Sequence, residues 1–403
     1  MLARSDSGTR DAALEAIAAG LEARTAEILE ANGRDMDAGA EAGLSSALLD
    51  RLKLTEERVA GIAGDVRSIA ALPDPVGETI EGRRLPNGLD VRKVRVPLGV
   101  IAVVYESRPN VTIDCSALCL KSGNAIVLRG SSMAAHSNAV LAGIARDAAA
   151  SVGLPADVIA LVAGGGREEL PELARQDEYL DLIIPRGGEG LKAVLKQHAK
   201  VPVIYAASGN CHVYVDASAD LDDAVAIAVN AKVQRPGVCN AAETLLVHSA
   251  VAPEFLPRAL KELQEAGVEL RVDARARSLA GDLAPSLNDA TEEDWATEFL
   301  ALVLAVRVVD SVEEAIEHVT RYGSGHSEAI LTGDYAAAQA FTTGVDAACV
   351  YVNASTRFTD GGQFGMGAEI GNSTQKLHAR GPIGIRELCT FKYVIEGTGQ
   401  VRP

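Results

Sequence analysis

Short apolar runs separated by helical segments constrain the fold of this chain more than any other feature. From residue 97 onward, runs of this kind alternate with stretches of helical pattern. A strand that is apolar along its whole length is buried on both faces, which requires helices on both sides of a parallel sheet. We therefore expect an α/β domain. Its predicted strands are residues 100–105, 125–128, 158–162 and 180–184.

A second pattern of the same kind follows in the C-terminal half. A chain of 403 residues is too long for one simple core, so we expect two or three domains. The only tryptophan, Trp295, precedes the second strand of this half. The second domain is predicted to contain strands at 244–248, 300–309, 329–331 and 348–352.

Residues 82–96 differ from both patterns. From Asp90 to Val96, apolar and basic residues alternate, which predicts a half-exposed strand in a protruding hairpin. The C-terminal residues 388–395 also have a strand pattern, and we expect them to pair with this hairpin. Because an exposed strand edge invites pairing with another chain, the sequence predicts a homo-oligomer, at least a dimer.

The N-terminal region is predicted to be helical. Residues 11–32 have helical spacing of apolar residues, and Asn32-Gly33 is a typical helix end. A second helix is expected to begin near Thr55, followed by an acidic first turn. We interpret both helices as scaffold.

Charge and composition exclude several classes of partner. The net charge is −17, which argues against nucleic acid or an anionic membrane. No apolar run reaches the roughly 18 residues of a membrane span, and the N-terminus lacks a signal-peptide pattern. The six cysteines fit no metal-binding spacing, so we expect reduced thiols, no metal and a cytoplasmic location. An anionic substrate would need local Arg, Lys or backbone N–H groups.

Three loops rich in Gly, Ser or Arg follow strands of the first predicted sheet, at residues 129–132, 164–167 and 185–190. Ligands of open α/β sheets bind at the carboxyl ends of the strands, where helix N-termini hold phosphates. No G-x-G-x-x-G motif is present. Any one of these loops alone is more often a tight turn, whereas the three together favour a cofactor that carries phosphate.

Cys239 is the candidate nucleophile. It follows a Pro236-Gly237 turn, and such a turn lets the backbone come close to a ligand and can leave the thiol exposed among backbone N–H donors. Such donors favour a thiolate and can hold a developing oxyanion. The alternative is that Cys239 is a small core residue, as most free cysteines are.

Seven segments in order along the chain resemble one family closely, the gamma-glutamyl phosphate reductases, also called glutamate-5-semialdehyde dehydrogenases. This family belongs to the aldehyde dehydrogenase superfamily. One such motif alone would be weak, but the series spans essentially the whole chain. The matching segments are residues 104–112, 118–124, 184–190, 236–240, 309–330, 352–358 and 376–382.

The resemblance implies an aldehyde dehydrogenase-like α/β fold with two parallel-sheet domains and an oligomerisation arm. It places an NADP(H)-binding domain at 1–237, with the 82–96 hairpin in the arm, and a catalytic domain at 238–370. Residues 371–403 would return to the cofactor domain and the arm. It also implies NADPH-dependent reduction of gamma-glutamyl phosphate in proline biosynthesis, with glutamate 5-kinase as a possible partner.

Several site residues follow from the resemblance. Cys239 matches the nucleophile of the superfamily, and Glu298 resembles the glutamate that holds the nicotinamide ribose. Arg129 and Ser132 stand where an adenine ribose binds, and Ser in place of Glu favours NADP(H), because an acidic side chain would repel a 2′-phosphate. The alternative is that Arg129 and Ser132 only cap a helix. In the third loop, Arg186, Gly187 and Gly188 are further candidates for binding the cofactor.

The phosphate and the α-carboxylate of such a substrate need cations to bind them, and the developing oxyanion needs hydrogen-bond donors. Guanidinium binds carboxylate and phosphate bidentately, so Arg108, Arg357 and Arg380 are candidates, although any one alone is more often a surface or interface residue. Asn110 is a candidate oxyanion donor, with helix capping as an equal alternative.

Hydrolytic aldehyde dehydrogenases carry a glutamate base in the segment that corresponds to residues 205–215, where this chain has none. That departure favours acyl transfer to phosphate over hydrolysis. A hydrolytic enzyme, or a binding protein that has kept only the fold, are the competing interpretations.

Overall fold

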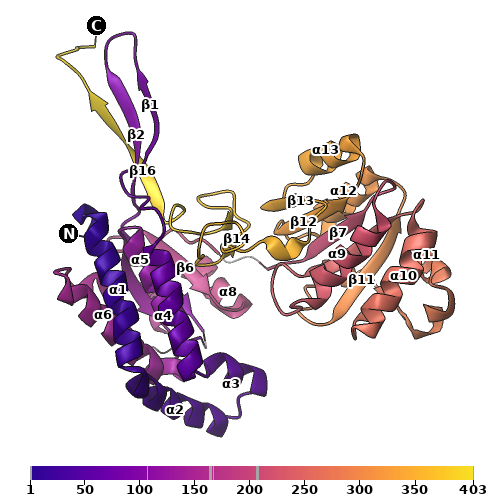
Figure 1. The fold of residues 1–403 in the computed structure, drawn as a ribbon, viewed down its shortest axis with the longest axis horizontal. Coiled ribbons are helices and arrows are strands. Elements are labelled where there is room, and N and C mark those ends of the chain that lie inside the picture. Colours follow the sequence, from indigo (N-terminus) through magenta and orange to yellow (C-terminus); the bar gives the residue numbers. More distant parts are fainter. Residues whose placement is uncertain (1, 107, 163–165, 167, 206–207, 403) are drawn as a thin grey trace.

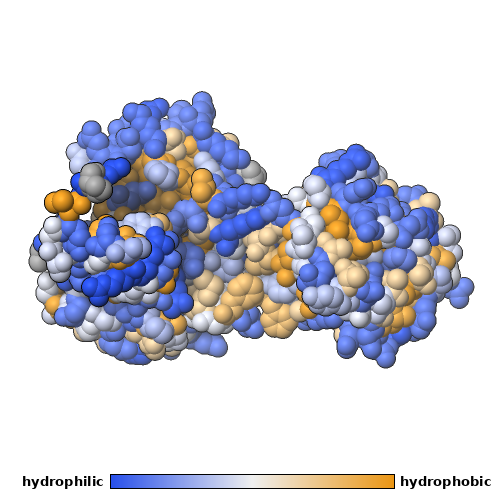
Figure 2. Space-filling model, turned by 90° about the horizontal axis from the view of Figure 1, so that it is seen from above, coloured by the Kyte–Doolittle hydropathy of each residue, from blue (hydrophilic) through white to orange (hydrophobic). Residues whose placement is uncertain are grey.

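The computed structural model describes residues 2–106, 108–162, 166, 168–205 and 208–402. Two α/β lobes lie side by side, and a ribbon of three strands stands out from the first lobe (Figure 1). Seen from above, a narrow neck joins the lobes, and hydrophilic residues cover most of the face in view (Figure 2). Among the described residues, no helix has both the length and the apolar character that crossing a membrane requires.

The first lobe is built on a four-stranded parallel sheet with the strand order β5-β4-β3-β6. All four strands predicted for this domain are confirmed, with ends that differ by a few residues. The chain runs from β3 outward to β5 and then returns to pair β6 with the other side of β3. A crevice for ligands is expected where the strand order reverses, at the carboxyl ends of β3 and β6. The strands are β3 (Val100–Tyr105), β4 (Ala125–Arg129), β5 (Ile159–Leu161) and β6 (Leu182–Arg186).

Helices cover both faces of this sheet, because its strands are apolar on both sides. Ile101 and Val103 belong to one hydrophobic core with the N-terminal helices, whereas Ala102 and Val104 pack with Leu195 on the other face. On the first face lie α1 (Ser7–Ala23), α4 (Glu56–Ala70), α5 (Asn110–Lys121) and α6 (Ala135–Ser151), with α2 (Thr25–Glu41) and α3 (Ser46–Leu52) at their end; on the second lie α7 (Glu169–Ala174) and α8 (Glu189–His198).

The single helix predicted over residues 11–32 is wrong. The chain forms two helices that meet at Arg24, whose backbone N–H still bonds to Gly20. Asn32 does not end a helix but lies buried inside α2. Its amide donates to the carbonyl of Leu52 and accepts from the N–H of Leu54 at 2.8 Å. A polar side chain with tertiary partners can stay within a helix, and sequence spacing does not reveal those partners. The second helix, by contrast, begins as predicted, with Thr55 as its N-cap.

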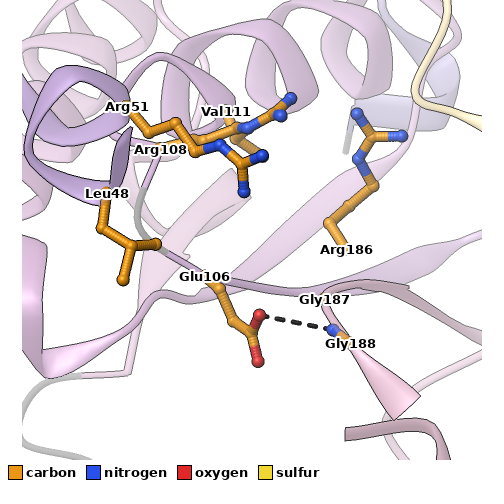
Figure 3. Close-up of a pocket in the computed structure, with 8 residues that line it drawn as sticks. All are labelled: Leu48, Arg51, Glu106, Arg108, Val111, Arg186, Gly187 and Gly188. Atoms are coloured by element: carbon orange, nitrogen blue, oxygen red, sulfur yellow. Dashed lines mark hydrogen bonds between the residues drawn. The ribbon is translucent and has the colours of Figure 1, made fainter. Parts of the chain in front are cut away.

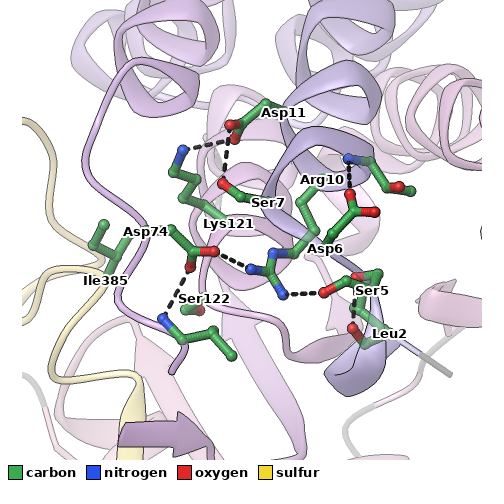
Figure 4. A network of polar contacts seen from close by, with 12 residues as sticks. Leu2, Ser5, Asp6, Ser7, Arg10, Asp11, Asp74, Lys121, Ser122 and Ile385 are labelled. Atoms are coloured by element: carbon green, nitrogen blue, oxygen red, sulfur yellow. Dashed lines mark hydrogen bonds and ion pairs between the residues drawn. The ribbon is translucent and has the colours of Figure 1, made fainter. Parts of the chain in front are cut away.

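Two buried cations tie the N-terminal helix to the rest of the first lobe (Figure 4). The Arg10 guanidinium pairs with Asp74 and donates to the carbonyl of Ser5. The Lys121 ammonium donates to Asp11 at 2.6 Å. Both cationic side chains are 2% exposed, so each is held by partners rather than by water.

The second lobe is built on a seven-stranded parallel sheet with the order β10-β9-β11-β8-β7-β12-β13. The four predicted strands are present. The predicted domain boundary at 237/238 falls inside this unit, because β7 and the helix α9 (Leu221–Val233) precede it and yet belong to the second lobe. The strands are β7 (Cys211–Val215), β8 (Ala242–His248), β9 (Glu269–Val272), β10 (Asn288–Asp289), β11 (Val303–Val309), β12 (Ser327–Leu331) and β13 (Cys349–Val352).

Helices again lie on both faces. The interior holds the ion pair Lys232–Glu243, in which both side chains are fully buried. One core contains residues of α9 (Leu221–Val233), α10 (Ala252–Glu265) and α11 (Ala274–Leu279), and the other contains residues of α12 (Val312–Tyr322) and α13 (Tyr335–Gly344). The 3₁₀ helices in the described part of the chain are η1 (Leu2–Arg4), η2 (Ser132–Ala134), η3 (Ala156–Val158), η4 (Gly281–Ser286), η5 (Asp294–Ala296) and η6 (Thr356–Phe358).

The protruding ribbon is an antiparallel sheet of β1 (Thr79–Arg84), β2 (Asp90–Pro97) and β16 (Cys389–Glu396), with β2 in the middle. The predicted pairing of the C-terminal strand with the hairpin is confirmed: Cys389 lies opposite Pro97, and Glu396 opposite Asp90. Before β16, the chain forms the short strands β14 (Asn372–Ser373) and β15 (Gly381–Pro382). The segment before β16 also contributes four apolar side chains to the core of the first lobe, those of Ile370, Ile383, Ile385 and Leu388.

Candidate active site

Cys239 lies in a turn between α9 and β8, at the end of the second lobe that faces the first. Its backbone is packed so closely against Gly209 that a Cβ at position 209 would lie 1.4 Å from the carbonyl oxygen of Cys239. The Cys211 thiol donates to the same carbonyl at 3.2 Å. Only glycine fits at 209, and this packing fixes the position of the cysteine turn.

Asn240, the residue after Cys239, holds the segment that carries Arg357 close to the cysteine. The Asn240 side chain donates to the carbonyl of Thr359 at 2.9 Å, and the Thr356 hydroxyl donates to the carbonyl of Asn240 at 2.7 Å. These bonds dock η6 against the cysteine turn. The Arg357 guanidinium also donates to Gln234 at 2.9 Å. Two motifs far apart in the sequence therefore meet at one place.

Cys239 differs from the other five cysteines because it alone is only partly buried. Burial raises the pKa of its thiol to about 11, and the nearby carboxylates of Glu298 and Glu369 add to this, whereas Arg186 opposes it. The Glu298 carboxylate accepts from the N–H of Gly209 at 2.6 Å. The thiolate therefore needs cationic groups, or displacement of those carboxylates, to form at neutral pH.

A cleft of about 350 Å³ opens at the carboxyl ends of β3 and β6, where the strand order reverses. Figure 3 shows Arg51 and Arg108 together on one side of it and Arg186 across from them. The Glu106 carboxylate accepts from the backbone N–H of Gly188, at the start of α8, at 3.3 Å. The remaining lining residues are Leu48, Val111 and Gly187.

A neighbouring cleft of about 580 Å³ joins the first lobe to the cysteine turn. Arg108 and Asn110 line it from the first lobe, and Arg235, Gly237 and Val238 line it from the segment that leads to Cys239. The cysteine turn therefore adjoins a cleft that both lobes form. Asp50, Arg51, Lys53, Leu54, Arg58, Gly61, Ile62 and Asp65 complete the lining.

The environment of Arg108 is strongly positive. Its pKa lies below the usual value, first because of burial and then because Arg186, Arg51 and Arg235 are near. Burial, followed by Arg235, also lowers the pKa of Arg357. Cations that repel one another in a cleft favour an anionic ligand.

Asn110 is the first residue of α5, and Pro109 takes the N-cap position. The Asn110 amide donates to Asp114 at 2.8 Å and makes no capping bond to the helix. Burial raises the pKa of Asp114 to about 7, and the bond from Asn110 opposes this shift. Capping, the alternative role for Asn110, is therefore not what its side chain does here.

Apart from Glu298, which lies beside the cysteine turn, the predicted cofactor residues lie at two places along the carboxyl edge of the first sheet. Arg186, Gly187 and Gly188 follow β6 at the reversal of strand order, and the N–H of Gly188 already faces an anion, the Glu106 carboxylate. At the end of β4, the Arg129 guanidinium donates to the carbonyl of Gly166 at 3.0 Å. These groups suit a ligand that carries phosphates.

Ser132 is exposed, and it is Ser131 rather than Ser132 whose side chain caps η2. The capping alternative therefore does not apply to Ser132. Of the predicted loop at 164–167, residues 164, 165 and 167 lie outside the described residues.

Comparison with known proteins agrees with this geometry. The profile of the aldehyde dehydrogenase family matches residues 3–280 and 283–394. A protein of Thermobifida fusca named gamma-glutamyl phosphate reductase is 56% identical over 98% of this chain and 93% of its own length. A protein of Moorella thermoacetica with the same name is 56% identical over 100% of this chain and 95% of its own length. The chain belongs to the gamma-glutamyl phosphate reductase family.

Solved structures agree with this placement in the gamma-glutamyl phosphate reductases. The crystal structure of the Thermotoga maritima enzyme has a TM-score of 0.97 and 48% identity, and the match covers 100% of this chain and 96% of that one. An acetylating aldehyde dehydrogenase of Geobacillus thermoglucosidasius has a TM-score of 0.69 at 20% identity, with 100% and 94% covered. The second likeness shows the fold alone.

Within this gamma-glutamyl phosphate reductase fold, the predicted substrate residues Arg357 and Arg380 are not among the residues that line the two clefts. Arg357 lies near the Cys239 thiol, whereas Arg380 is held by Asp346. The Arg380 guanidinium donates to the carboxylate of Asp346 at 2.7 Å and to its carbonyl at 3.0 Å. Conversely, Arg51 and Arg235 line the clefts and were not predicted from the sequence. Arg235 directly precedes the Pro236-Gly237 turn, which was an available signal. Arg51 had none, because it lies on α3, a helix that the sequence analysis did not predict.

Proposed function

We propose that this chain reduces gamma-glutamyl phosphate to glutamate-5-semialdehyde and phosphate, with NADPH as hydride donor, in proline biosynthesis. The observation that carries the proposal is the partly buried Cys239 in a turn beside a cleft lined with arginines. A thiol nucleophile and a strongly cationic cleft suit an acyl group that arrives bearing phosphate. The family of the chain supports the same reaction.

In the proposed mechanism, the Cys239 thiolate attacks the acyl carbon and displaces phosphate, so that the glutamyl group is held as a thioester. Arg108 and Arg357 bind the anionic groups of the substrate, since neither guanidinium is paired with a carboxylate among the described residues. Arg380 has no part in this proposal, because Asp346 holds it. Positive charge beside the thiol also favours the thiolate.

The oxygen of the tetrahedral intermediate needs donors. We assign this role to the backbone N–H of Cys239 and to the side chain of Asn110, which lines the cleft beside Val238. The Asn110 amide group has two N–H bonds, and Asp114 accepts one of them. The other can donate to an oxyanion.

When bound, NADPH supplies the hydride that reduces the thioester. The residues proposed to hold it are Arg129 and Ser132 at the end of β4, the loop from Arg186 to Gly188 at the start of α8, and Glu298 beside the cysteine turn. A serine at 132 leaves room for a 2′-phosphate that an acidic residue would repel. NADPH is therefore favoured over NADH.

A hydrolytic aldehyde dehydrogenase is the second candidate, and one observation bears on it. The described part of segment 205–215 holds no carboxylate, but Glu298 and Glu369 lie close enough to affect the Cys239 thiol. Both already accept backbone N–H bonds, from Gly209 and Gly361 respectively. We assign Glu298 to the cofactor, and Glu369 also accepts from the Asn372 side chain at 3.0 Å. Phosphate therefore remains the preferred acyl partner.

We also propose that the arm assembles the chain into a homo-oligomer. Four large apolar side chains on this ribbon are exposed, which favours burial against another copy. Light scattering of the purified protein would measure the mass of the assembly. The exposed side chains are Ile80, Phe391, Tyr393 and Ile395.

Docking of glutamate 5-kinase and a cytoplasmic location stay predictions. The location is expected because a reduced nucleophilic thiol suits a reducing compartment.

The test is NADP⁺ reduction with glutamate-5-semialdehyde, with and without phosphate, for wild type and Cys239→Ala. We expect activity that requires phosphate and falls at least about a thousandfold in the variant, as for other lost nucleophiles. Cys389→Ala, at the base of the arm, is the matched control and should retain activity. Phosphate-independent oxidation would instead identify a hydrolytic enzyme, and an inactive wild type would refute the proposal.

A further inference from the structure

The larger cleft contains more cationic side chains than the phosphate of the substrate alone requires. Arg51, Arg108 and Arg235 all line it. Burial first, and then the other arginines nearby, lower the pKa of Arg108. Within the described residues, none of these three guanidinium groups has a hydrogen bond or ion-pair partner. The chain has 55 acidic and 38 basic residues, so carboxylates to pair with them are not scarce. The absence of such partners here is consistent with a site that receives an anion from outside.

A fourth arginine of the same cleft provides the contrast. Arg58 donates to the Asp50 carboxylate at 2.8 Å and to the carbonyls of Asp50 and Lys53, both at 2.7 Å. Its charge is thus already compensated by the protein. Arg51, on the preceding helix α3, lines the cleft without such a partner in the described chain. Lining the cleft and being available to a ligand are therefore separate properties.

The cleft also contains an acidic side chain suited to a cation. Asp65, on α4, lines it, and its carboxylate forms no hydrogen bond or ion pair in the part of the chain that the structure describes. It lies near Asp114, which is held by Asn110. The cleft thus presents cationic groups and a separate carboxylate, the pattern that complements a zwitterion.

We propose that this cleft binds the amino-acid end of the substrate, with Arg51 and Arg235 on the α-carboxylate and Asp65 on the α-ammonium group. This inference rests on the proposed function and deepens it. The acyl carbon must reach Cys239, and a short aliphatic chain links it to the charged end of the molecule. Because Gly237 and Val238 line the cleft next to Cys239, the cleft is placed to hold that end. Arg108, which lines both clefts, is left for the phosphate.

The oxidative reaction separates these roles, because aldehyde, phosphate and NADP⁺ are then three substrates with three KM values. Arg51→Gln should raise the KM for glutamate-5-semialdehyde about tenfold or more, as expected for a lost charge-assisted bond, and leave the KM for phosphate and for NADP⁺ unchanged. Arg235→Gln should behave in the same way. Arg58→Gln is the matched control, since that guanidinium is occupied within the protein, and it should leave all three constants as in wild type.

Asp65 is tested by the choice of aldehyde. Wild type should prefer glutamate-5-semialdehyde over 5-oxopentanoate, which lacks the amino group, and Asp65→Asn should reduce that preference about tenfold. Thermal unfolding of each variant confirms that the fold is retained. This readout distinguishes an ammonium contact from a general loss of activity.

The outcomes are distinct. If Arg51→Gln instead raises the KM for phosphate or NADP⁺, that residue belongs to another subsite and the assignment falls. If wild type is active and the Arg51, Arg235 and Asp65 variants all match Arg58→Gln, the inference fails while the proposed function stands. If wild type does not oxidise the semialdehyde at all, the proposed function itself fails.

Discussion

Two groups of charged residues in the first lobe differ in how their charges are compensated. In the N-terminal network, Arg10 pairs with Asp74 and Lys121 with Asp11 (Figure 4). In the cleft, Arg108 lies beside other arginines and is repelled by them (Figure 3). The two cations of the first group are almost completely withdrawn from solvent, whereas the second group lines an open cleft.

The difference shows how charge can be assigned to stability or to function. A buried cation that the protein pairs internally fixes the packing of its segments, and removing it leaves a buried partner uncompensated. Cations gathered without internal partners contribute little to folding, and their interaction energy is available to a ligand. Each group should therefore respond to substitution in a different measurement, activity for the cleft and unfolding for the network.

The largest effect is expected in the cleft. Arg108→Gln should lower kcat/KM for the semialdehyde and phosphate about a hundredfold, because a guanidinium that binds an oxyanion bidentately is lost. The midpoint of thermal unfolding should stay within a few degrees of wild type or rise, since repulsion among the arginines is relieved. A clear loss of stability without loss of activity would show that the cleft arginines belong with the structural group.

Arg10→Met is the reciprocal test in the network. We expect the free energy of unfolding to fall by about 3 kcal/mol, because Asp74 would stay in a largely buried place without its cation. Denaturant unfolding measures this quantity. The kcat/KM of the folded protein should be that of wild type, and a large loss of activity would mean that the two groups are coupled.

Much of the fold was predictable, because each strand of the first lobe is a continuous apolar run between helices. What could not be predicted depends on partners distant in the sequence. Strand β7 contains His212, whose buried ring bonds to Glu328 on β12 at 2.9 Å, so that a polar residue interrupts an apolar run. Asn32 stays within α2 for the same reason. In the site, Cys239 could be predicted as the nucleophile from the turn that precedes it. Arg51 could not be predicted, because it reaches the cleft only through the packing of α3.

A smaller effect concerns the acidity of the Cys239 thiol, whose pKa is raised to about 11. Glu298→Gln removes a negative charge that disfavours the thiolate, so that pKa should fall by about one pH unit. Arg186→Gln removes an opposing positive charge, so the pKa should rise. Well below the pKa, alkylation follows the thiolate fraction, and iodoacetamide should modify Glu298→Gln several-fold faster and Arg186→Gln more slowly than wild type. Equal shifts in both variants would indicate changed access rather than charge.

The smallest effect is expected at Arg380, which the sequence placed with the substrate arginines and which the structure pairs with Asp346. Lys376 pairs with the same carboxylate at 2.5 Å, so Asp346 keeps a cation when Arg380 is replaced. Arg380→Gln should therefore change kcat/KM by less than about threefold and stability by no more than about 1 kcal/mol, as for partly exposed ion pairs. Steady-state assays of Arg380→Gln and Arg108→Gln under the same conditions give the two values of kcat/KM to compare. A loss at Arg380 as large as that at Arg108 would mean that Asp346 releases this arginine to the substrate, and internal pairing would then no longer separate the two groups.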